Sequence, residues 1–249
     1  MSLEYLVFAN ILLIPRLLYL GADGPMPRAR LVAMTLAQCL LVALALDWNW
    51  ALAVGVVIII GCNAFEGWYV DGSDRATSWR LTSLLLLLLV PAYLATWLGG
   101  FVLSGAMPVL ISHLCETLPL LQALCRADAA FLGTLLFGLL LLANESNMLI
   151  RAVFHYLGLE PRQESAAGDR VIDAAEYSAG RAIGILERWL MLIVVLWSDD
   201  LSALAFIIAA KGLARFKQLD DRQFAEYMLV GTLLSALAAI AVGAAIKHL

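Results

Sequence analysis

The sequence predicts an all-α protein, a polytopic transmembrane helix bundle with about eight spans plus one interfacial amphipathic helix. Hydrophobic residues make up 63% of the 249 positions and charged residues only 14%, with a mean hydropathy of +0.88. Soluble domains are about half apolar and a quarter charged, so this composition lies outside that class. Apolar runs of about 20 residues, the length that crosses a bilayer, recur along the chain. We expect one integral membrane domain over residues 1–249.

The first four predicted spans lie within residues 1–98. The run at 3–20 is interrupted by Pro15, which we expect to kink the helix, and by Arg16, which we expect to snorkel to the interface. Because no basic residues precede this run, we expect it to remain as a helix rather than to be cleaved as a signal. The other three runs are 31–46, 51–65 and 81–98, with a polar loop expected at 67–79.

Residues 99–128 are predicted to form an outer segment rather than a span. Apolar side chains recur there at helical spacing from Met107 to Leu121, while His113 and Glu116 lie off that stripe. This pattern is typical of an amphipathic helix lying on the membrane, interrupted near Pro119, and a re-entrant segment is the alternative. Whether Cys115 and Cys125 pair stays open, because a disulfide there requires an oxidising compartment.

The last four predicted spans lie within residues 129–249. The fifth begins as a fully apolar run and continues through a polar cluster, NESN at 144–147, to residue 156. The most polar loop follows at 158–173, and a tight turn is expected at 198–200. The remaining spans are 180–196, 201–216 and 224–246.

The distribution of basic residues indicates an orientation. If the N-terminus lies outside, fourteen of the sixteen Lys and Arg residues fall at cytoplasmic helix ends, and only Arg126 and Lys247 remain outside. Cytoplasmic loops of membrane proteins carry such an excess of Lys and Arg. Eight spans with both termini outside are therefore the topology that we expect.

Polar residues of the C-terminal spans gather on the predicted cytoplasmic side. Asn144, Asn147 and Arg151 share one helical face, and Asn63 and Glu66 end the third span on the same side. We take as a candidate intramembrane polar site the residues Asn144, Glu145, Asn147, Arg151, Arg181, Glu187, Arg188, Lys211, Arg215 and Glu226. No catalytic residue, metal ligand or cofactor is assigned.

A structural interpretation of these charges competes with a functional one. Cations at cytoplasmic helix ends are what the topology alone requires, and they can snorkel. Glu187 and Glu226 would then pair with them and hold helices together. The series Tyr227, Gly231, Ser235, Ala239 and Gly243, spaced by four, is interpreted as a small-residue stripe for close helix packing.

Several chemistries are disfavoured by the residue pattern. The net charge of -4 gives no global basic character, and no nucleic-acid-binding motif appears, so we expect no nucleic-acid partner. No phosphate-binding glycine loop, nucleophile elbow or zinc-protease motif is present. His113, Cys115 and Glu116 are spaced i, i+2 and i+3, which does not place three ligands on one helical face.

The C-terminal half resembles a group of uncharacterised bacterial integral membrane proteins. The resemblance covers residues 143–243 and rests on NESN at 144–147, GRAIGILER at 180–188, AAKGLARF at 209–216 and EYMLVGTLLS at 226–235. It implies the bacterial cytoplasmic (inner) membrane as the location and implies no mechanism. The first four spans carry no such resemblance.

Three function classes follow from these expectations. The first is a small transporter or channel-like protein with a charged cytoplasmic vestibule, which would take an anionic solute or lipid headgroup because cations exceed carboxylates there. The alternatives are an integral membrane enzyme acting on a phosphorylated or lipid-linked substrate, and a membrane-anchored scaffold or partner subunit. The lipid bilayer is the expected surrounding partner, and a protein partner or homo-oligomer stays open.

Overall fold

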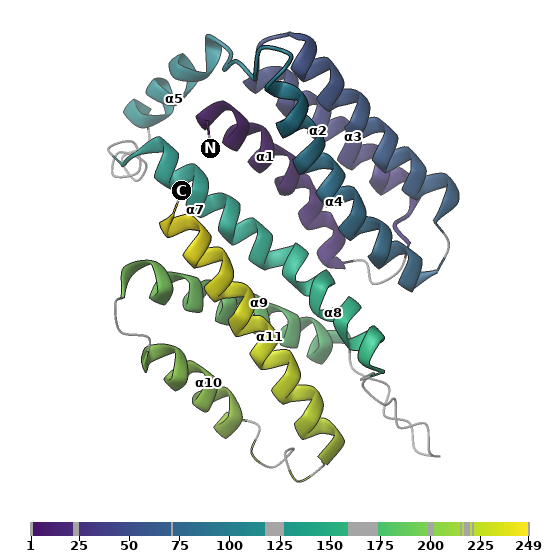
Figure 1. The fold of residues 1–249 in the computed structure, drawn as a ribbon, viewed down its shortest axis with the longest axis vertical. Coiled ribbons are helices and arrows are strands. Elements are labelled where there is room, and N and C mark those ends of the chain that lie inside the picture. Colours follow the sequence, from purple (N-terminus) through teal and green to yellow (C-terminus); the bar gives the residue numbers. More distant parts are fainter. Residues whose placement is uncertain are drawn as a thin grey trace. The chain divides into compact units, whose positions relative to one another are not determined.

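The structure, a computed structural model, describes residues 2–21, 25–70, 72–117, 127–158, 174–198, 202–214, 216, 220 and 222–248. The described part of the chain is almost entirely helical, and its one extended pairing is a single bridge between Leu46 and Leu103 (Figure 1). Contacts divide the chain into two compact units, Met1–Asn144 and Glu145–Leu249. They are called unit 1 and unit 2, and each is described by itself.

Unit 1 is built around its first helix. Its elements are α1 (Leu3–Arg16), the 3-10 helix η1 (Leu17–Gly21), α2 (Arg28–Ala45), α3 (Trp50–Tyr69), α4 (Ser73–Ala95), α5 (Ala106–Thr117) and α7 (Ala129–Leu140). Helix α1 packs against α2, α4 and α7, and α3 packs against α2 and α4. At the centre of the core the Phe8 ring stacks on Phe101, with 4.4 Å between ring centroids. Gly55 permits this contact, since a Cβ there would lie 3.1 Å from the Phe8 ring.

Local signals explain where these helices begin. The side chain of Asn49, in the tight turn after α2, accepts a hydrogen bond from the Leu52 amide (2.8 Å) and so caps α3. The same side chain donates to the carbonyl of Gly100 (2.8 Å) and holds the turn against the end of α4. Gly72, with φ of +85°, precedes α4 in the left-handed region that favours glycine.

The prediction of a polar loop at 67–79 is wrong. Helix α3 continues to Tyr69 and α4 already begins at Ser73, so only three residues connect the two helices. The polar sequence is helical because its large side chains pack on α3. The indole of Trp79 donates to the Cys62 carbonyl (3.1 Å) and its ring lies against Phe65, with centroids 4.2 Å apart.

Unit 2 consists of helices that pack around the α9–α11 pair. Its helices are α8 (Ser146–Leu157), α9 (Ala174–Trp197), α10 (Ser202–Ala214) and α11 (Arg222–Lys247). Helix α9 packs along α11, α10 packs on α9, and α8 packs on α11.

The predicted small-residue stripe of α11 is confirmed as a packing surface. Ser235 and Ala239 are buried, and a Cβ at Gly243 would lie 2.5 Å from Cγ1 of Val195 on α9. Near the other end of the stripe, the Tyr227 ring stacks on Phe154 of α8 with 4.5 Å between centroids. Small side chains therefore let α8 and α9 approach the same helix closely.

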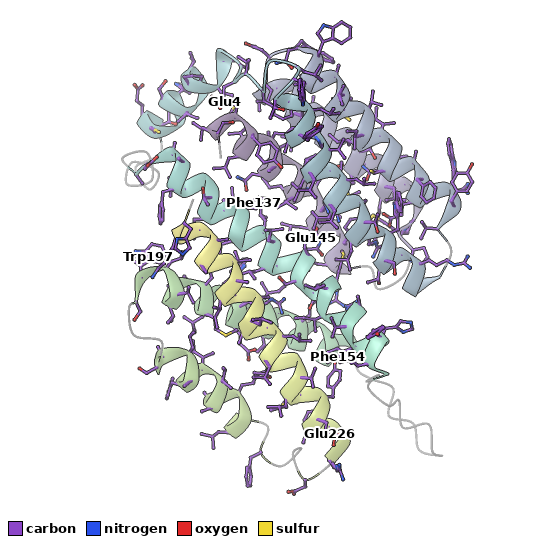
Figure 2. All side chains as sticks on the ribbon, viewed as in Figure 1. Glu4, Phe137, Glu145, Phe154, Trp197 and Glu226 are labelled. Carbon is purple, nitrogen blue, oxygen red and sulfur yellow. The ribbon has the colours of Figure 1, made fainter. Side chains whose placement is uncertain are left out.

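Six helical segments of the described chain are long and apolar enough to cross a membrane. They are Leu3–Leu20, Arg28–Ala45, Trp50–Tyr69, Arg75–Ala95, Ala129–Leu157 and Phe224–Lys247. Leu36, Leu89 and Trp97 are among the exposed large apolar side chains, which is compatible with contact to lipid. Figure 2 shows many side chains projecting from the helices. The chain is therefore described as a membrane protein.

Eight spans are not confirmed. Helix α9 has the necessary length, but it carries Arg181, Glu187 and Arg188 within its apolar stretch. Helix α10 has only 13 residues, which corresponds to about 20 Å at 1.5 Å per residue, against a hydrocarbon thickness of about 30 Å.

The outer segment contains the expected helix, α5, at Ala106–Thr117. Its predicted interruption near Pro119 lies outside the described residues, as do residues 159–173 of the predicted polar loop and most of the turn at 198–200. Cys115 on α5 is disulfide-bonded, whereas Cys39 and Cys62 are free thiols. The fourth cysteine, Cys125, lies outside the described residues.

Candidate functional site

A group of charged side chains lies inside unit 1 at one end of its helices. Arg16 ends α1, Glu66 lies in the last turn of α3, and Arg80 lies in the second turn of α4. Together with Tyr19 and Ser83 they are called the Arg–Glu cluster. The exposed fractions of Arg16, Glu66 and Arg80 are 1%, 3% and 2%, so their charges are inside the protein and away from lipid and water.

The carboxylate of Glu66 is held on both oxygens. Its Oε1 accepts from Nε of Arg80 (3.0 Å), and its Oε2 accepts from the Tyr19 hydroxyl (2.7 Å). The guanidinium of Arg80 also lies over the Tyr19 ring, 4.2 Å from its centre. The two donors and the ring make a cradle whose shape and charge suit a carboxylate.

The position of Arg16 corrects a prediction from the sequence. Its Nη2 donates to the carbonyl of Arg80 (2.8 Å), its Nη1 donates to the Ser83 hydroxyl (3.3 Å), and its guanidinium carbon lies 5.1 Å from the Tyr19 ring centre. The expectation that Arg16 snorkels to the interface is therefore wrong. The carbonyl, hydroxyl and aromatic ring of neighbouring elements replace water around the guanidinium, so it remains inside the bundle.

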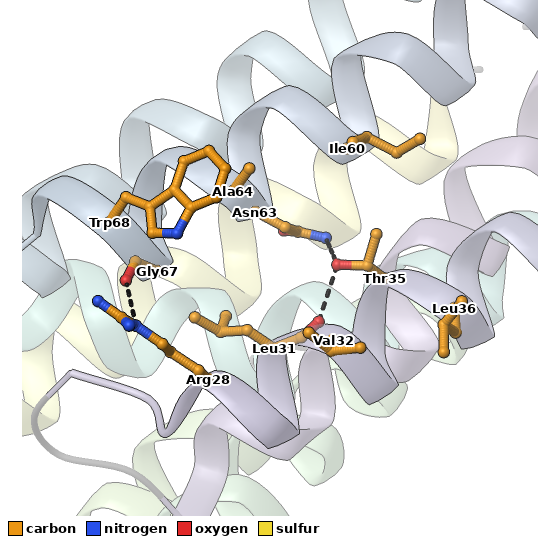
Figure 3. A pocket seen from close by; sticks show the side chains of 10 residues that line it. All are labelled: Arg28, Leu31, Val32, Thr35, Leu36, Ile60, Asn63, Ala64, Gly67 and Trp68. Atoms are coloured by element: carbon orange, nitrogen blue, oxygen red, sulfur yellow. Dashed lines mark hydrogen bonds between the residues drawn. The ribbon is translucent and has the colours of Figure 1, made fainter.

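A neutral chain of polar side chains joins α1, α2 and α3 deeper in the same unit. The amide nitrogen of Gln38 donates to the Leu12 carbonyl, and that of Asn63 donates to the side-chain oxygens of Gln38 and Thr35, each at 2.9 Å. The Thr35 hydroxyl donates to the Leu31 carbonyl (2.8 Å) (Figure 3). The hydrogen bonds of Gln38 and Asn63 connect neighbouring helices and so fix their register where no water can substitute for a partner.

Helices α1 and α7 approach closely around Asn10. The Asn10 amide donates to the carbonyls of Gly133 (2.9 Å) and Leu6 (3.0 Å). A Cβ at Gly133 would lie 2.7 Å from Cδ2 of Leu6, so the absence of a side chain permits the contact. This contact positions the start of the fifth predicted span.

In unit 2, two of the predicted site residues, Glu187 and Lys211, form an ion pair. Nζ of Lys211 on α10 donates to Oε2 of Glu187 on α9, and both side chains are about four-fifths buried. The pair crosses from one helix to the next, as the structural interpretation of the sequence expected for Glu187. Each of the two charges is therefore compensated by its partner on the neighbouring helix.

The expectation that Glu226 belongs to a charged vestibule finds no support in its contacts. Its Oε1 accepts from Nε of Arg222 (2.9 Å), four residues earlier on the same helix, and both side chains are largely exposed. The hydrogen bond to Glu226, followed by its negative charge, raises the pKa of Arg222. This is a surface pair of a kind that contributes little to stability.

The polar cluster at 144–147 coincides with a local change of helix type. Residues Leu141–Glu145 form a π-helix, η3, between α7 and α8, and Asn144, Glu145 and Ser146 are buried and none is without a partner. Figure 2 shows Glu145 at this point of the ribbon. Single π-helical turns occur frequently at functional sites.

The other described members of the predicted set lie on α8 and α9 of unit 2. Asn147 and Arg151 on α8 and Arg181 on α9 are half-buried, while Arg188 is fully buried. Arg215 lies outside the described residues. Among the described members of the predicted set, Glu187 and Lys211 form an ion pair, and interactions are also made by Asn144, Glu145, Arg151, Arg181 and Arg188.

Sequence reasoning missed the assembly of the Arg–Glu cluster. From the sequence, Arg16 is expected to snorkel to the interface, Arg80 counts only as one of the cytoplasmic cations, and Glu66 ends its span without an assigned partner. The available signal was that three charges interrupt or border the first, third and fourth apolar runs on the same predicted side. Tyr19, Gln38 and Ser83 carried no signal of their own, because their residue types are ordinary within apolar helices.

A comparison of the chain with protein families, curated proteins and solved structures finds no match. The site is therefore interpreted from its own geometry. Within the part of the chain that the structure describes, no group of three or more His, Cys, Asp and Glu side chains lies close enough to hold a metal ion.

Proposed function

We propose that the protein is a small transporter or channel-like membrane protein for anionic solutes, and that the Arg–Glu cluster of unit 1 is its anion-selecting site. The observation that supports this is the cradle around Glu66, in which Arg80 and Tyr19 each donate to one carboxylate oxygen. Guanidinium and hydroxyl donors in this arrangement suit a carboxylate or a phosphate oxygen. In the resting state the side chain of Glu66 occupies the position that a solute anion would take.

The cost of burying these groups favours a functional role. Taking an ion pair out of water costs several kcal/mol per ion, and apolar residues of similar volume are often as stabilising or more so. Ionisable side chains inside membrane proteins are accordingly rare and mark solute paths. Because Arg16, Glu66 and Arg80 are buried, this state is closed, and entry of an anion requires the Glu66 carboxylate to leave the cradle.

We further propose that the protein lies in the bacterial cytoplasmic membrane with both termini outside, so that the Arg–Glu cluster is near the cytoplasmic face. The disulfide-bonded Cys115 supports this orientation. Cys115 lies on α5, and the segment just before α5 pairs with the C-terminal end of α2, where the Ser104 amide donates to the Ala45 carbonyl (2.9 Å). This end of α2 is opposite to the end at which the Arg–Glu cluster lies. A disulfide at that end fits an oxidising outer compartment.

Cysteine labelling tests the orientation. In a background with Cys39 and Cys62 changed to Ala, the exposed positions Ser2→Cys and Lys247→Cys are expected to react with a membrane-impermeant maleimide in intact cells. Arg75→Cys, at the cluster end of α4, is expected to react only after permeabilisation. Labelling of Arg75→Cys in intact cells would reverse the proposed orientation.

Anion flux tests the function. Liposomes containing the purified protein are expected to take up labelled chloride, acetate or phosphate faster than protein-free liposomes. Glu66→Asp withdraws the carboxylate from the cradle by one methylene and weakens its competition with the solute. Loss of a hydrogen bond to a charged group changes binding by about tenfold, so the half-saturating anion concentration is expected to fall by about that factor.

The exposed carboxylate of Glu226 provides the matched control for that measurement. Glu226→Asp shortens an exposed side chain that pairs with Arg222 on its own helix, and it is expected to leave half-saturation unchanged. Flux that responds equally to both substitutions would place the solute path away from the cluster. Folded protein that conducts none of the three anions but retains a stoichiometric partner protein would favour a scaffold instead.

A further inference from the structure

A narrow groove runs along the outer surface of unit 1 between α2 and α3. It has a volume of about 270 Å³ and is lined by Arg28, Leu31, Val32, Thr35, Leu36, Ile60, Asn63, Ala64, Gly67 and Trp68. Figure 3 shows Arg28 and Trp68 at one end of the groove and Leu36 and Ile60 at the other. The groove is separate from the Arg–Glu cluster and is not used by the proposed transport.

The dimensions of the groove restrict what it can hold. Arg28 and Leu36 are eight residues apart on α2, and Trp68 and Ile60 are eight apart on α3, so each wall is about 12 Å long at 1.5 Å per residue. Helices α2 and α3 pack against each other, and the axes of packed helices lie about 8–10 Å apart. The groove between them is therefore narrower than a helix, which has a diameter of about 10–12 Å, and suits a single hydrocarbon chain.

The walls of the groove face the surroundings of the protein. Val32, Leu36, Ile60 and Trp68 are among the exposed large hydrophobic residues, and both helices have the length and composition of membrane spans. Because both helices are long and apolar enough to cross a bilayer, we expect lipid chains around Leu36 and Ile60. An apolar side chain exposed in this way is stable in the bilayer, and a chain seated in the groove adds close packing on both sides.

At the end of the groove near Trp68, a hydrogen bond fixes the position of the cation Arg28. Nε of Arg28 donates to the Gly67 carbonyl (3.1 Å), which fixes the exposed guanidinium beside the last turn of α3. This hydrogen bond uses Nε, so the terminal nitrogens Nη1 and Nη2 keep the fork geometry that binds phosphate oxygens. Trp68 lies at the same level, and tryptophan is enriched at the membrane–water interface.

We propose that this groove binds one acyl chain of an anionic phospholipid whose phosphate lies on Arg28. The apolar walls account for the chain, and the fixed guanidinium accounts for the headgroup and its negative charge. If this end faces the cytoplasm, as proposed above, the lipid comes from the leaflet whose anionic lipids attract basic segments.

Native mass spectrometry of the detergent-purified full chain tests the site, with phosphatidylglycerol and phosphatidylcholine added separately. Wild type is expected to retain phosphatidylglycerol at least about tenfold more strongly than phosphatidylcholine. Arg28→Ala is expected to reduce that retention by about tenfold, as for loss of hydrogen bonds to a charged group. Leu36→Trp, which fills the groove, is expected to weaken retention of both lipids.

Two matched variants keep the test specific. Arg30→Ala removes an exposed cation from the same turn as Arg28. Leu44→Trp enlarges an exposed residue that does not line the groove. Both variants are expected to retain lipid like wild type. Equal losses in Arg28→Ala and Arg30→Ala would mean unspecific charge attraction. A protein dimer without bound lipid that is lost in Leu36→Trp would assign the groove to a second copy, and either result overturns the proposal. Neither depends on whether anion flux is found.

Discussion

Glu66→Gln is expected to lower the free energy of unfolding by about 3–5 kcal/mol, the cost of removing one partner from a buried ion pair. The substitution keeps the shape of the side chain but leaves the guanidinium of Arg80, which is buried inside unit 1, without its carboxylate. It also changes the acceptor for the Tyr19 hydroxyl from a charged to a neutral oxygen. Denaturant unfolding in detergent, followed by tryptophan fluorescence, measures the change.

Two further variants separate loss of charge balance from loss of packing. The double variant Glu66→Gln with Arg80→Met removes both members of the ion pair and is expected to regain most of the lost stability, because the Arg80 charge is no longer buried without its carboxylate. Glu226→Gln breaks an exposed pair and is expected to leave the unfolding midpoint where it is. An unchanged midpoint for Glu66→Gln itself would show that the cluster does not stabilise unit 1 through its charges.

Gly243→Leu is expected to destabilise unit 2 by about 1–3 kcal/mol, the usual cost of overpacking a close contact. The position has no room for a side chain, since a Cβ would lie 2.5 Å from Cγ1 and 3.0 Å from Cβ of Val195, which belongs to the facing helix α9. These are atoms at the base of a branched side chain rather than at a flexible tip. Helices α9 and α11 must therefore separate, and the same unfolding measurement reports the loss.

Gly212→Leu is the control for this position, because a Cβ on that glycine of α10 meets no atom within 4 Å. It is expected to be neutral or slightly stabilising, since Leu favours the helix over Gly by several tenths of a kcal/mol. Val195→Ala combined with Gly243→Ala exchanges volume across the contact and is expected to be milder than Gly243→Ala alone. If Gly243→Leu unfolds like Gly212→Leu, close packing at this end of α11 is not required.

Some helix boundaries could be predicted from the local residue types. Asn49 follows an apolar run in a short polar turn and caps the next helix, as its residue type favours, and the small residues of α11 at intervals of four form the packing surface that their spacing predicts. The short connection between α3 and α4 could not be predicted in this way. Residues 73–80 are polar, and their helical state depends on Trp79 and Arg80 finding partners on α3.

The sequence by itself determined that this is a helical membrane protein, because length and hydropathy of each run are local properties that decide whether a helix can cross a bilayer. It also placed polar residues near the ends of those helices. Only the tertiary structure decided which of them meet. Arg16, Glu66 and Arg80 are 50 and 14 positions apart, and no helical period relates residues on three different helices. Their burial depends on how α1, α3 and α4 pack, so an arginine that the sequence places at the interface lies inside the protein instead.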